Sequence, residues 1–237
     1  MTRARRVGVV RGTVQGVGFR PFLARLAARE GVAGEARNAG GVVHVDVEGA
    51  EEAVRRFQES LRGEAPAAAR VETVSWRSET PRGREGFEIA ASEHAAPDAL
   101  PLPPDLAPCA DCLTELRDPA ARRSGYAFTS CAGCGPRASI VTGLPYDRAR
   151  TTMAGFPLCP ACRAEYDAIT DRRHHAQPLA CPTCGPRLSL TDRLGRQVAE
   201  RPLEASRAAL RRGEVLAVMG VGGFQLVCDA TDERAVR

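Results

Sequence analysis

Hydrophobic and polar positions follow two different periods over residues 1–91, and together the periods predict a small α+β domain. A period of two, typical of a half-buried strand, runs through Val42–Glu48. A helical period runs through Ala50–Leu61 and puts Val54, Phe57 and Leu61 on one face. The other expected elements are a helix over Pro21–Glu30 and strands over Arg5–Arg11, Val71–Trp76 and Phe87–Ala90. The order β-α-β-β-α-β predicts a ferredoxin-like split βαβ fold, a four-stranded antiparallel sheet with two helices on one face.

Three changes of composition follow residue 91. Residues 92–107 are rich in Ala and Pro and have no period, which predicts a linker. Residues 108–190 carry eight of the nine cysteines and little apolar periodicity, so they need a source of stability other than an apolar core. A helical pattern returns near Leu203 and is expected to end at Gly213, and Val215–Val218 is predicted to be a buried strand.

Eight cysteines form a duplicated array. They make four C-x2-C pairs, at Cys109 and Cys112, Cys131 and Cys134, Cys159 and Cys162, and Cys181 and Cys184. Each of the last four lies 50 residues after its counterpart, and Cys-Gly-Pro-Arg recurs at 134–137 and 184–187, so the segment is an internal duplication. Two such pairs supply a tetrahedron of thiolates with no open position. We therefore predict two structural Zn²⁺ ions, one in each of two fingers at residues 108–150 and 151–195.

Other assignments remain open for the polar residues of this region. Disulfides or an iron–sulfur cluster are the alternatives to zinc for the same cysteine spacing. His174 and His175 precede Cys181 closely, but four thiolates already complete each set, which favours a polar or packing role for both. Cys228 stands alone in an apolar context and is typical of a small buried hydrophobe rather than a nucleophile.

A glycine-bearing loop, Gly12–Arg20, joins the first strand to the first helix. A loop of this kind at a helix N-terminus directs several backbone N–H groups at one place and forms an anion site. Arg20, expected at an exposed loop-to-helix junction, adds a guanidinium fork for phosphate oxygens. The GK[ST] of a Walker loop is missing, which excludes that class of nucleotide site.

The same segment matches the signature G-x-V-Q-G-V-x-F-R completely and so resembles the acylphosphatase family. The resemblance implies that Arg20 binds a phosphoryl group, which is also cradled by the amides of Gln15, Gly16, Val17, Gly18 and Phe19. It further implies that Asn38 orients the attacking water; a plain turn residue before Gly40 is the alternative. Acyl phosphates are already activated, so charge stabilisation and a positioned water suffice for hydrolysis.

The chain as a whole resembles the first part of the HypF carbamoyltransferase family of [NiFe]-hydrogenase maturation. The similarity adds the finger segments 122–137 and 172–187, and residues 213–226 look like the opening of an α/β YrdC-like domain, here 203–237. It implies carbamoyl phosphate as substrate, ATP and Mg²⁺ in the full-length proteins, and transfer to the C-terminal Cys of a HypE-like partner. Family members are much longer, and Met219 stands where they usually have Lys. We therefore expect a fragment that hydrolyses acyl phosphates without carbamoyl transfer.

The composition of the chain indicates a globular protein and gives no sign of a membrane span. Hydrophobic residues make up 43% and charged residues 26% of the chain, as in globular proteins. No apolar run reaches the roughly 18 residues of a membrane span, and none forms a signal-peptide core. Nine cysteines then favour metal ligation in the cytoplasm over disulfides.

Two other functions compete with the leading one. The first is a stand-alone acylphosphatase with zinc appendages, and the second a zinc-dependent module that binds nucleic acid or protein. Phosphate contacts for the second would come from Arg117, Arg122, Arg123, Arg137, Arg172, Arg173 and Arg187, and RNA binding from the YrdC-like part. The net charge of +4 is small and spread along the chain, and the fingers lack an aromatic stacking set or recognition helix.

Overall fold

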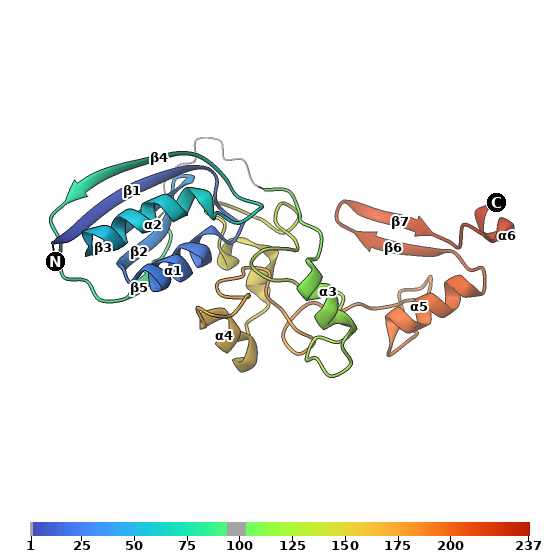
Figure 1. Ribbon diagram of the computed structural model, residues 1–237. Helices are drawn as coiled ribbons and strands as arrows, with labels where there is room; N and C mark the ends of the chain where they lie inside the picture. Colours follow the sequence, from blue (N-terminus) through green and yellow to red (C-terminus); the bar gives the residue numbers. More distant parts are fainter. Residues whose placement is uncertain (1, 94–102) are drawn as a thin grey trace. The chain divides into compact units, whose positions relative to one another are not determined.

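A computed structural model describes residues 2–93 and 103–237 (Figure 1). It divides into two compact units, Met1–Gly185 and Pro186–Arg237, which are described separately below. The first unit holds both the predicted α+β domain and the cysteine-rich segment. Residues 94–102 of the expected linker lie outside the described residues.

The first unit begins with a five-stranded sheet. Its strands are β1 (Arg3–Thr13), β2 (Ala33–Ala39), β3 (Val42–Ala50), β4 (Arg70–Glu79) and β5 (Phe87–Ile89), in the order β4-β1-β3-β2-β5. Strands β1 to β4 pair antiparallel, as predicted. The expectation of four strands was wrong, because no strand was predicted over Ala33–Ala39, where β2 forms between β3 and β5. The expected strand β5 pairs parallel to β2 beside Gly34–Ala36 and satisfies backbone groups that β2 would otherwise leave unpaired.

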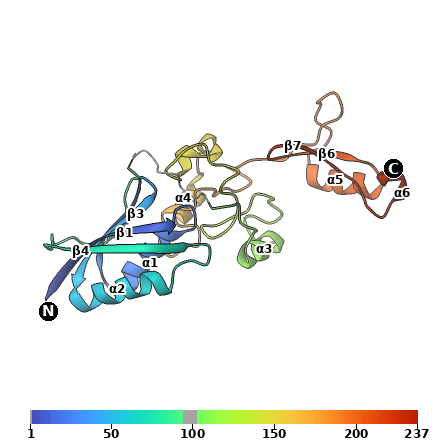
Figure 2. The ribbon, with the colours of Figure 1, turned by 90° about the horizontal axis from the view of Figure 1, so that it is seen from above.

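Two helices, α1 (Phe19–Glu30) and α2 (Glu51–Gly63), cover one face of this sheet, as Figures 1 and 2 show. Left-handed glycines flank α1: Gly18 has φ 74° and Gly31 has φ 70°, a conformation that disfavours other residues. The core lies between helices and sheet; its members include Leu23, Leu26, Val43, Val45, Val47, Val54, Phe57 and Leu61. The predicted apolar face of α2 is therefore confirmed, and the core fixes the loop that precedes α1.

The cysteine-rich part contains little regular structure. Its elements are α3 (Ala110–Arg117), α4 (Pro160–Asp167) and the 3₁₀ turns η1 (Arg148–Arg150) and η2 (Thr152–Gly155). The helices α3 and α4 each begin directly after the first cysteine of a set, at positions 50 residues apart. The duplication seen in the sequence is therefore a duplication of local structure.

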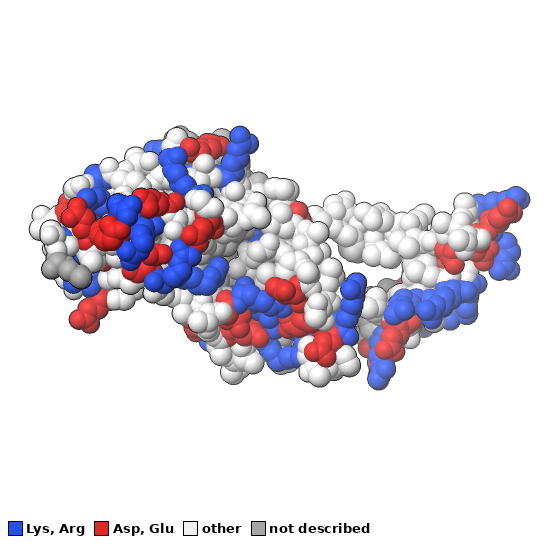
Figure 3. All heavy atoms as spheres, in the orientation of Figure 1, with Lys and Arg blue, Asp and Glu red and all other residues white. Residues whose placement is uncertain are grey.

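The second unit consists of α5 (Pro202–Arg211), the antiparallel hairpin β6 (Leu216–Gly220) and β7 (Gly223–Val227), and α6 (Glu233–Val236). The expected buried strand is instead exposed, with Val218 at 47% and Met219 at 67%. Within this unit β6 pairs with β7 alone. Figure 3 shows the visible face of the hairpin free of charged side chains. Among the described residues, no helix is long and apolar enough to cross a membrane.

Candidate active site and metal clusters

The loop between β1 and α1 has the conformation of an anion site. Gly16 and Gly18 are both left-handed, with φ 71° and 74°. No protein acceptor for the N–H groups of residues 15–19 is found in the part of the chain that the structure describes. Donors left unpaired at the start of a helix bind an anion readily, because the helix dipole is positive at that end.

Arg20 lies in the first turn of α1 with its guanidinium inside the protein. Its Nη2 lies 2.6 Å from Asp147 Oδ1, and its Nη1 donates to Ser92 Oγ at 3.2 Å. Only 10% of the side chain is exposed, so the expected exposed junction was wrong. The reason is that residues of the cysteine-rich segment cover this end of the domain.

A small cavity adjoins the loop, with a volume of about 30 Å³. Of the residues expected to bind phosphate, five line it: Gln15, Gly16, Gly18, Phe19 and Arg20. Val17 does not, because it is fully buried in the apolar core. The opposite wall belongs to the cysteine-rich segment and includes Ala132, Arg137, Tyr146, His175 and Gln177.

Asn38 lies in β2 with 1% of its surface exposed, so it is a strand residue and not the turn residue of the alternative. Neither amide atom of its side chain has a partner among the described residues. Its carbonyl accepts from the N–H of Glu93 at 2.8 Å, next to the Ser92 that contacts Arg20. A buried amide without a protein partner is rare and indicates a place for water or ligand. Asn38 does not line the cavity itself, so its role stays a prediction.

The first finger holds the anion loop through Arg137, which is 1% exposed. Its Nε donates to the carbonyl of Gly16, and its Nη2 donates to that of Ala132 at 2.8 Å. Its Nη1 donates to the carbonyls of Cys134 and Pro136 at 2.9 and 2.8 Å. The guanidinium therefore ties two segments together and presents no free fork to a phosphate. The sequence marked Arg137 as part of a repeated motif and as a candidate phosphate contact, and did not indicate its contact with the loop.

His174 and His175 stay outside the cysteine clusters. The His175 ring packs on Tyr166 with centroids 4.8 Å apart. Burial, together with the charges of His174 and Arg20, lowers the pKa of His175 to about 4. The imidazole beside the cavity is therefore neutral at pH 7, and the packing interpretation holds for both residues.

Four thiol sulfurs meet in each half of the duplicated segment. In the first set the Sγ–Sγ distances are 3.8 Å for Cys109–Cys131, 3.6 Å for Cys131–Cys134 and 3.5 Å for Cys134–Cys112. In the second set, formed by Cys159, Cys162, Cys181 and Cys184, they are 3.6 to 3.7 Å. A tetrahedron with metal–sulfur bonds of about 2.3 Å has edges of about 3.8 Å, so both sets fit one ion. None of the eight forms a disulfide, which removes that alternative.

Comparisons with known proteins agree with this geometry. The acylphosphatase family model matches residues 6–89, and the HypF finger model matches 109–141 and 158–191. An acylphosphatase of Thermotoga maritima is 46% identical over 81 residues, which is 34% of this chain and 89% of the relative. The first domain belongs to the acylphosphatase family. The expected α+β fold of this domain is thereby confirmed.

The similarity extends over nearly the whole chain. Carbamoyltransferase HypF of Rhodobacter capsulatus is 50% identical over 231 residues, 96% of this chain and 30% of the relative. The crystal structure of full-length HypF in the phosphate- and nucleotide-bound form matches with a TM-score of 0.89 and 34% identity, over 99% of this chain and 31% of that one. The chain is similar to HypF proteins over nearly its whole length and spans about 30% of the length of such relatives.

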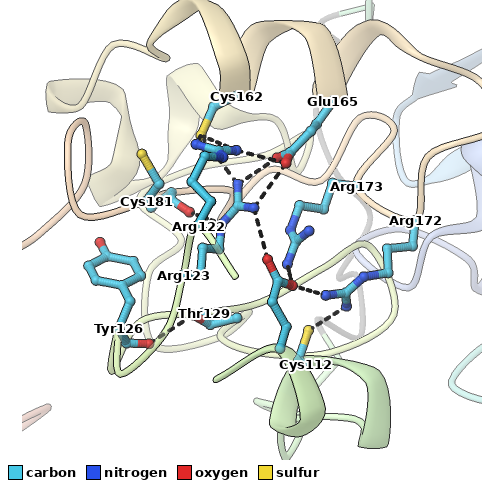
Figure 4. A network of polar contacts seen from close by, with 12 residues as sticks. Cys112, Arg122, Arg123, Tyr126, Thr129, Cys162, Glu165, Arg172, Arg173 and Cys181 are labelled. Carbon is cyan, nitrogen blue, oxygen red and sulfur yellow. Dashed lines mark hydrogen bonds and ion pairs between the residues drawn. The ribbon is translucent and has the colours of Figure 1, made fainter. Parts of the chain in front are cut away.

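The two fingers of this HypF-like chain exchange arginines (Figure 4). Arg122 and Arg123 of the first copy donate to Cys162 Sγ of the second at 3.4 and 3.3 Å. Both also pair with Glu165, at 2.7 and 2.5 Å. Burial works to raise the pKa of Glu165, but hydrogen bonds from Arg123 and Arg122 outweigh it and lower the pKa to about 2. The carboxylate is therefore charged at neutral pH.

The reverse contacts come from the second copy. Arg172 donates to Cys112 Sγ at 2.8 Å, and both Arg172 and Arg173 pair with Glu115. Each residue of this second half lies 50 positions from its counterpart in the first, so the interface has a local two-fold relation. Four thiolates around a divalent ion carry a net charge of −2, and guanidinium donors from the other copy offset it.

These contacts bear on the alternative of a nucleic-acid-binding module. Arg123, Arg137 and Arg173 are 0%, 1% and 4% exposed, and their donors are used inside the protein. The face of the first unit in Figure 3 mixes positive and negative side chains. Three of the seven arginines considered for phosphate contacts are therefore not available to a nucleic acid.

Proposed function

We propose that the first domain hydrolyses acyl phosphates and that carbamoyl phosphate is the substrate in the whole protein. One observation carries the proposal: in an acylphosphatase-family domain, one cavity is lined by Arg20 and by Gln15, Gly16, Gly18 and Phe19, whose N–H groups have no acceptor among the described residues. Nothing else in the described part of the chain combines these donors.

The residues divide the work as follows. Arg20 and the amides of Gln15 to Phe19 bind the phosphoryl oxygens and stabilise the charge that develops on them. Asn38 holds the attacking water through its otherwise unpartnered amide. The water oxygen bonds to phosphorus, the bond from phosphorus to the acyl oxygen breaks, and the acyl group leaves as a carboxylate. The two protons of water end on the phosphate, so no covalent intermediate with the protein is needed.

We propose that each cysteine set holds one structural Zn²⁺. Four thiolates leave no position for water, so the ions stabilise the fold of the fingers and take no part in hydrolysis. The corresponding domains are 1–91 for the acylphosphatase-like part, 92–107 for the linker, 108–150 and 151–195 for the fingers, and 203–237 for the start of a YrdC-like domain.

For the whole protein we propose carbamoyl transfer in the cytoplasm. Relatives that this chain matches over 96% of its length are named carbamoyltransferase HypF, and one related structure binds phosphate and nucleotide. ATP with Mg²⁺ would activate carbamate, and a HypE-like protein would accept the carbamoyl group. The residues described above are those of the first step, hydrolysis, and we expect this chain to perform that step.

Arg20→Ala tests the site. Loss of a charged, bidentate donor costs several kcal/mol at the transition state, so turnover of carbamoyl phosphate and benzoyl phosphate should fall by about a hundredfold or more. Arg25→Ala, an exposed arginine of the same helix, is the matched control and should keep wild-type turnover. Phosphate release by both purified variants is the measurement. A variant at Arg20 that keeps most of the turnover refutes the assignment.

A further inference from the structure

The cavity beside the anion loop is too small for the group it is proposed to bind. Its volume of about 30 Å³ has room for about two water molecules, each of which needs about 10–15 Å³. In an acyl phosphate, four oxygens surround the phosphorus atom. A phosphoryl group that reaches Arg20 must in addition compete with the groups that Arg20 already contacts.

Asp147 is the acid among those contacts, although its own side chain does not line the cavity. Its carboxylate lies 2.6 Å from Arg20 Nη2, and 29% of the Asp147 side chain is exposed against 10% for Arg20. Tyr146 and Arg148 on either side are anchored: the Tyr146 hydroxyl donates to Pro136 O at 3.2 Å, and Arg148 Nη1 donates to Gln177 O at 2.6 Å. The backbone is thus held while the Asp147 side chain has access to solvent.

Three basic side chains among the described residues line the cavity, and of these Arg20 is the one that forms an ion pair with a carboxylate. Arg137 uses its donors on backbone carbonyls, and His175 is neutral. Burial works to raise the pKa of Asp147, but the charge of Arg20, with hydrogen bonds from Ser92 and Arg20, holds it below its ordinary value. The Asp147 carboxylate is therefore an anion at neutral pH.

We propose that Asp147 is an internal anion that pairs with Arg20 in the closed site and is displaced by the phosphoryl oxygens of the substrate. Asp147 is thus a positioning residue that sets the affinity and selectivity of the site. A carboxylate monoanion offers Arg20 no more charge than Asp147 does, whereas a phosphoryl dianion offers more and also reaches the loop N–H groups. The inference rests on the proposed acyl-phosphate hydrolysis at the same site.

Titration of inorganic phosphate by calorimetry tests the proposal. Asp147→Asn removes the charge at nearly constant shape and should bind phosphate about tenfold more tightly, because the competing closed state is lost. Asp147→Glu keeps the charge and should stay within about threefold of wild type. Asp167→Asn, at a 60% exposed carboxylate at the end of α4, makes the same charge change and should have no effect. Structural damage alone weakens binding, so tighter binding is a distinctive result.

Equal or weaker phosphate binding by Asp147→Asn overturns the proposal, and so does equal tightening in Asp147→Glu. If Asp147→Asn does not fold, competition on the wild-type protein decides: a hundredfold excess of acetate should leave phosphate binding unchanged, and competition by acetate refutes the proposed selectivity. Turnover of carbamoyl phosphate by the wild type reports the proposed function separately. Binding of phosphate without turnover would refute the proposed hydrolysis. The ratio of the phosphate affinities of Asp147→Asn and the wild type would still test the role of Asp147.

Discussion

Arg123→Met should loosen both metal sites at once. The guanidinium is 1% exposed and binds both glutamates, at 3.2 Å for Glu115 and 2.5 Å for Glu165. Its Nε also donates to Ala180 O at 2.7 Å. Removing one member of a buried ion pair costs about 3–5 kcal/mol. Here the value should be near 3 kcal/mol, because Arg122 still pairs with Glu165, and Arg172 and Arg173 still pair with Glu115.

Zinc release to a chromophoric chelator measures this loss. A change of about 3 kcal/mol raises the population of locally opened fingers by about a hundredfold, and release should accelerate by a similar factor when opening precedes it. Metal analysis before the assay should find two ions per chain in the wild type. Arg117→Met, on the exposed end of α3, is the control and should release zinc at the wild-type rate. Unchanged release by Arg123→Met would show that the buried arginine does not connect the fingers.

Two further predictions concern the contacts around the anion loop. Arg137→Met should lower acyl-phosphate turnover about tenfold, because the carbonyl of Gly16 loses its donor and the loop loses its fixed conformation. Steady-state kinetics on protein with unchanged zinc content measure the effect. An unaltered kcat/KM would contradict the prediction. His175→Asn should flatten the decline of thermal stability on acidification. The folded pKa of about 4 lies below the unfolded value of about 6.5, so the unfolded chain binds more protons in that window and stability falls as pH falls through it. Asn tolerates the φ of 50° at this position, so the substitution removes the titrating group without straining the backbone. The measurement is the melting temperature of both proteins at pH 7 and pH 5. An equal decrease in melting temperature for the wild type and the variant would refute the prediction.

The sequence was most informative where short-range patterns decide the structure. The period of Val54, Phe57 and Leu61 determined the buried face of α2, and the duplicated cysteine spacing located both clusters. Each pattern is local or repeated, so it can be read without the fold. The short strand β5 was visible as a β-rich run, but its parallel pairing with β2 depends on an edge that only the assembled sheet creates.

Contacts between segments distant in sequence could not be predicted. Asp147 reaches Arg20 across 127 positions, and Arg137 reaches Gly16 across 121. No pattern of residues in the first finger indicates that its side chains cover the loop. For this reason Arg20 was expected to be exposed. The observed contacts instead join the loop and Arg20 directly to the finger.

The exchange of arginines between the fingers has a consequence for the history of the duplicated segment. A single ancestral finger would carry both the arginine pair and the glutamate, and a second copy of itself could satisfy them as a symmetric dimer. Fusion of two such copies in one chain turns that association into an intramolecular one at high effective concentration. Each copy now supplies the arginines that pair with the glutamate of the other copy. Loss of one copy would therefore leave the arginines and the glutamate of the other copy without these partners.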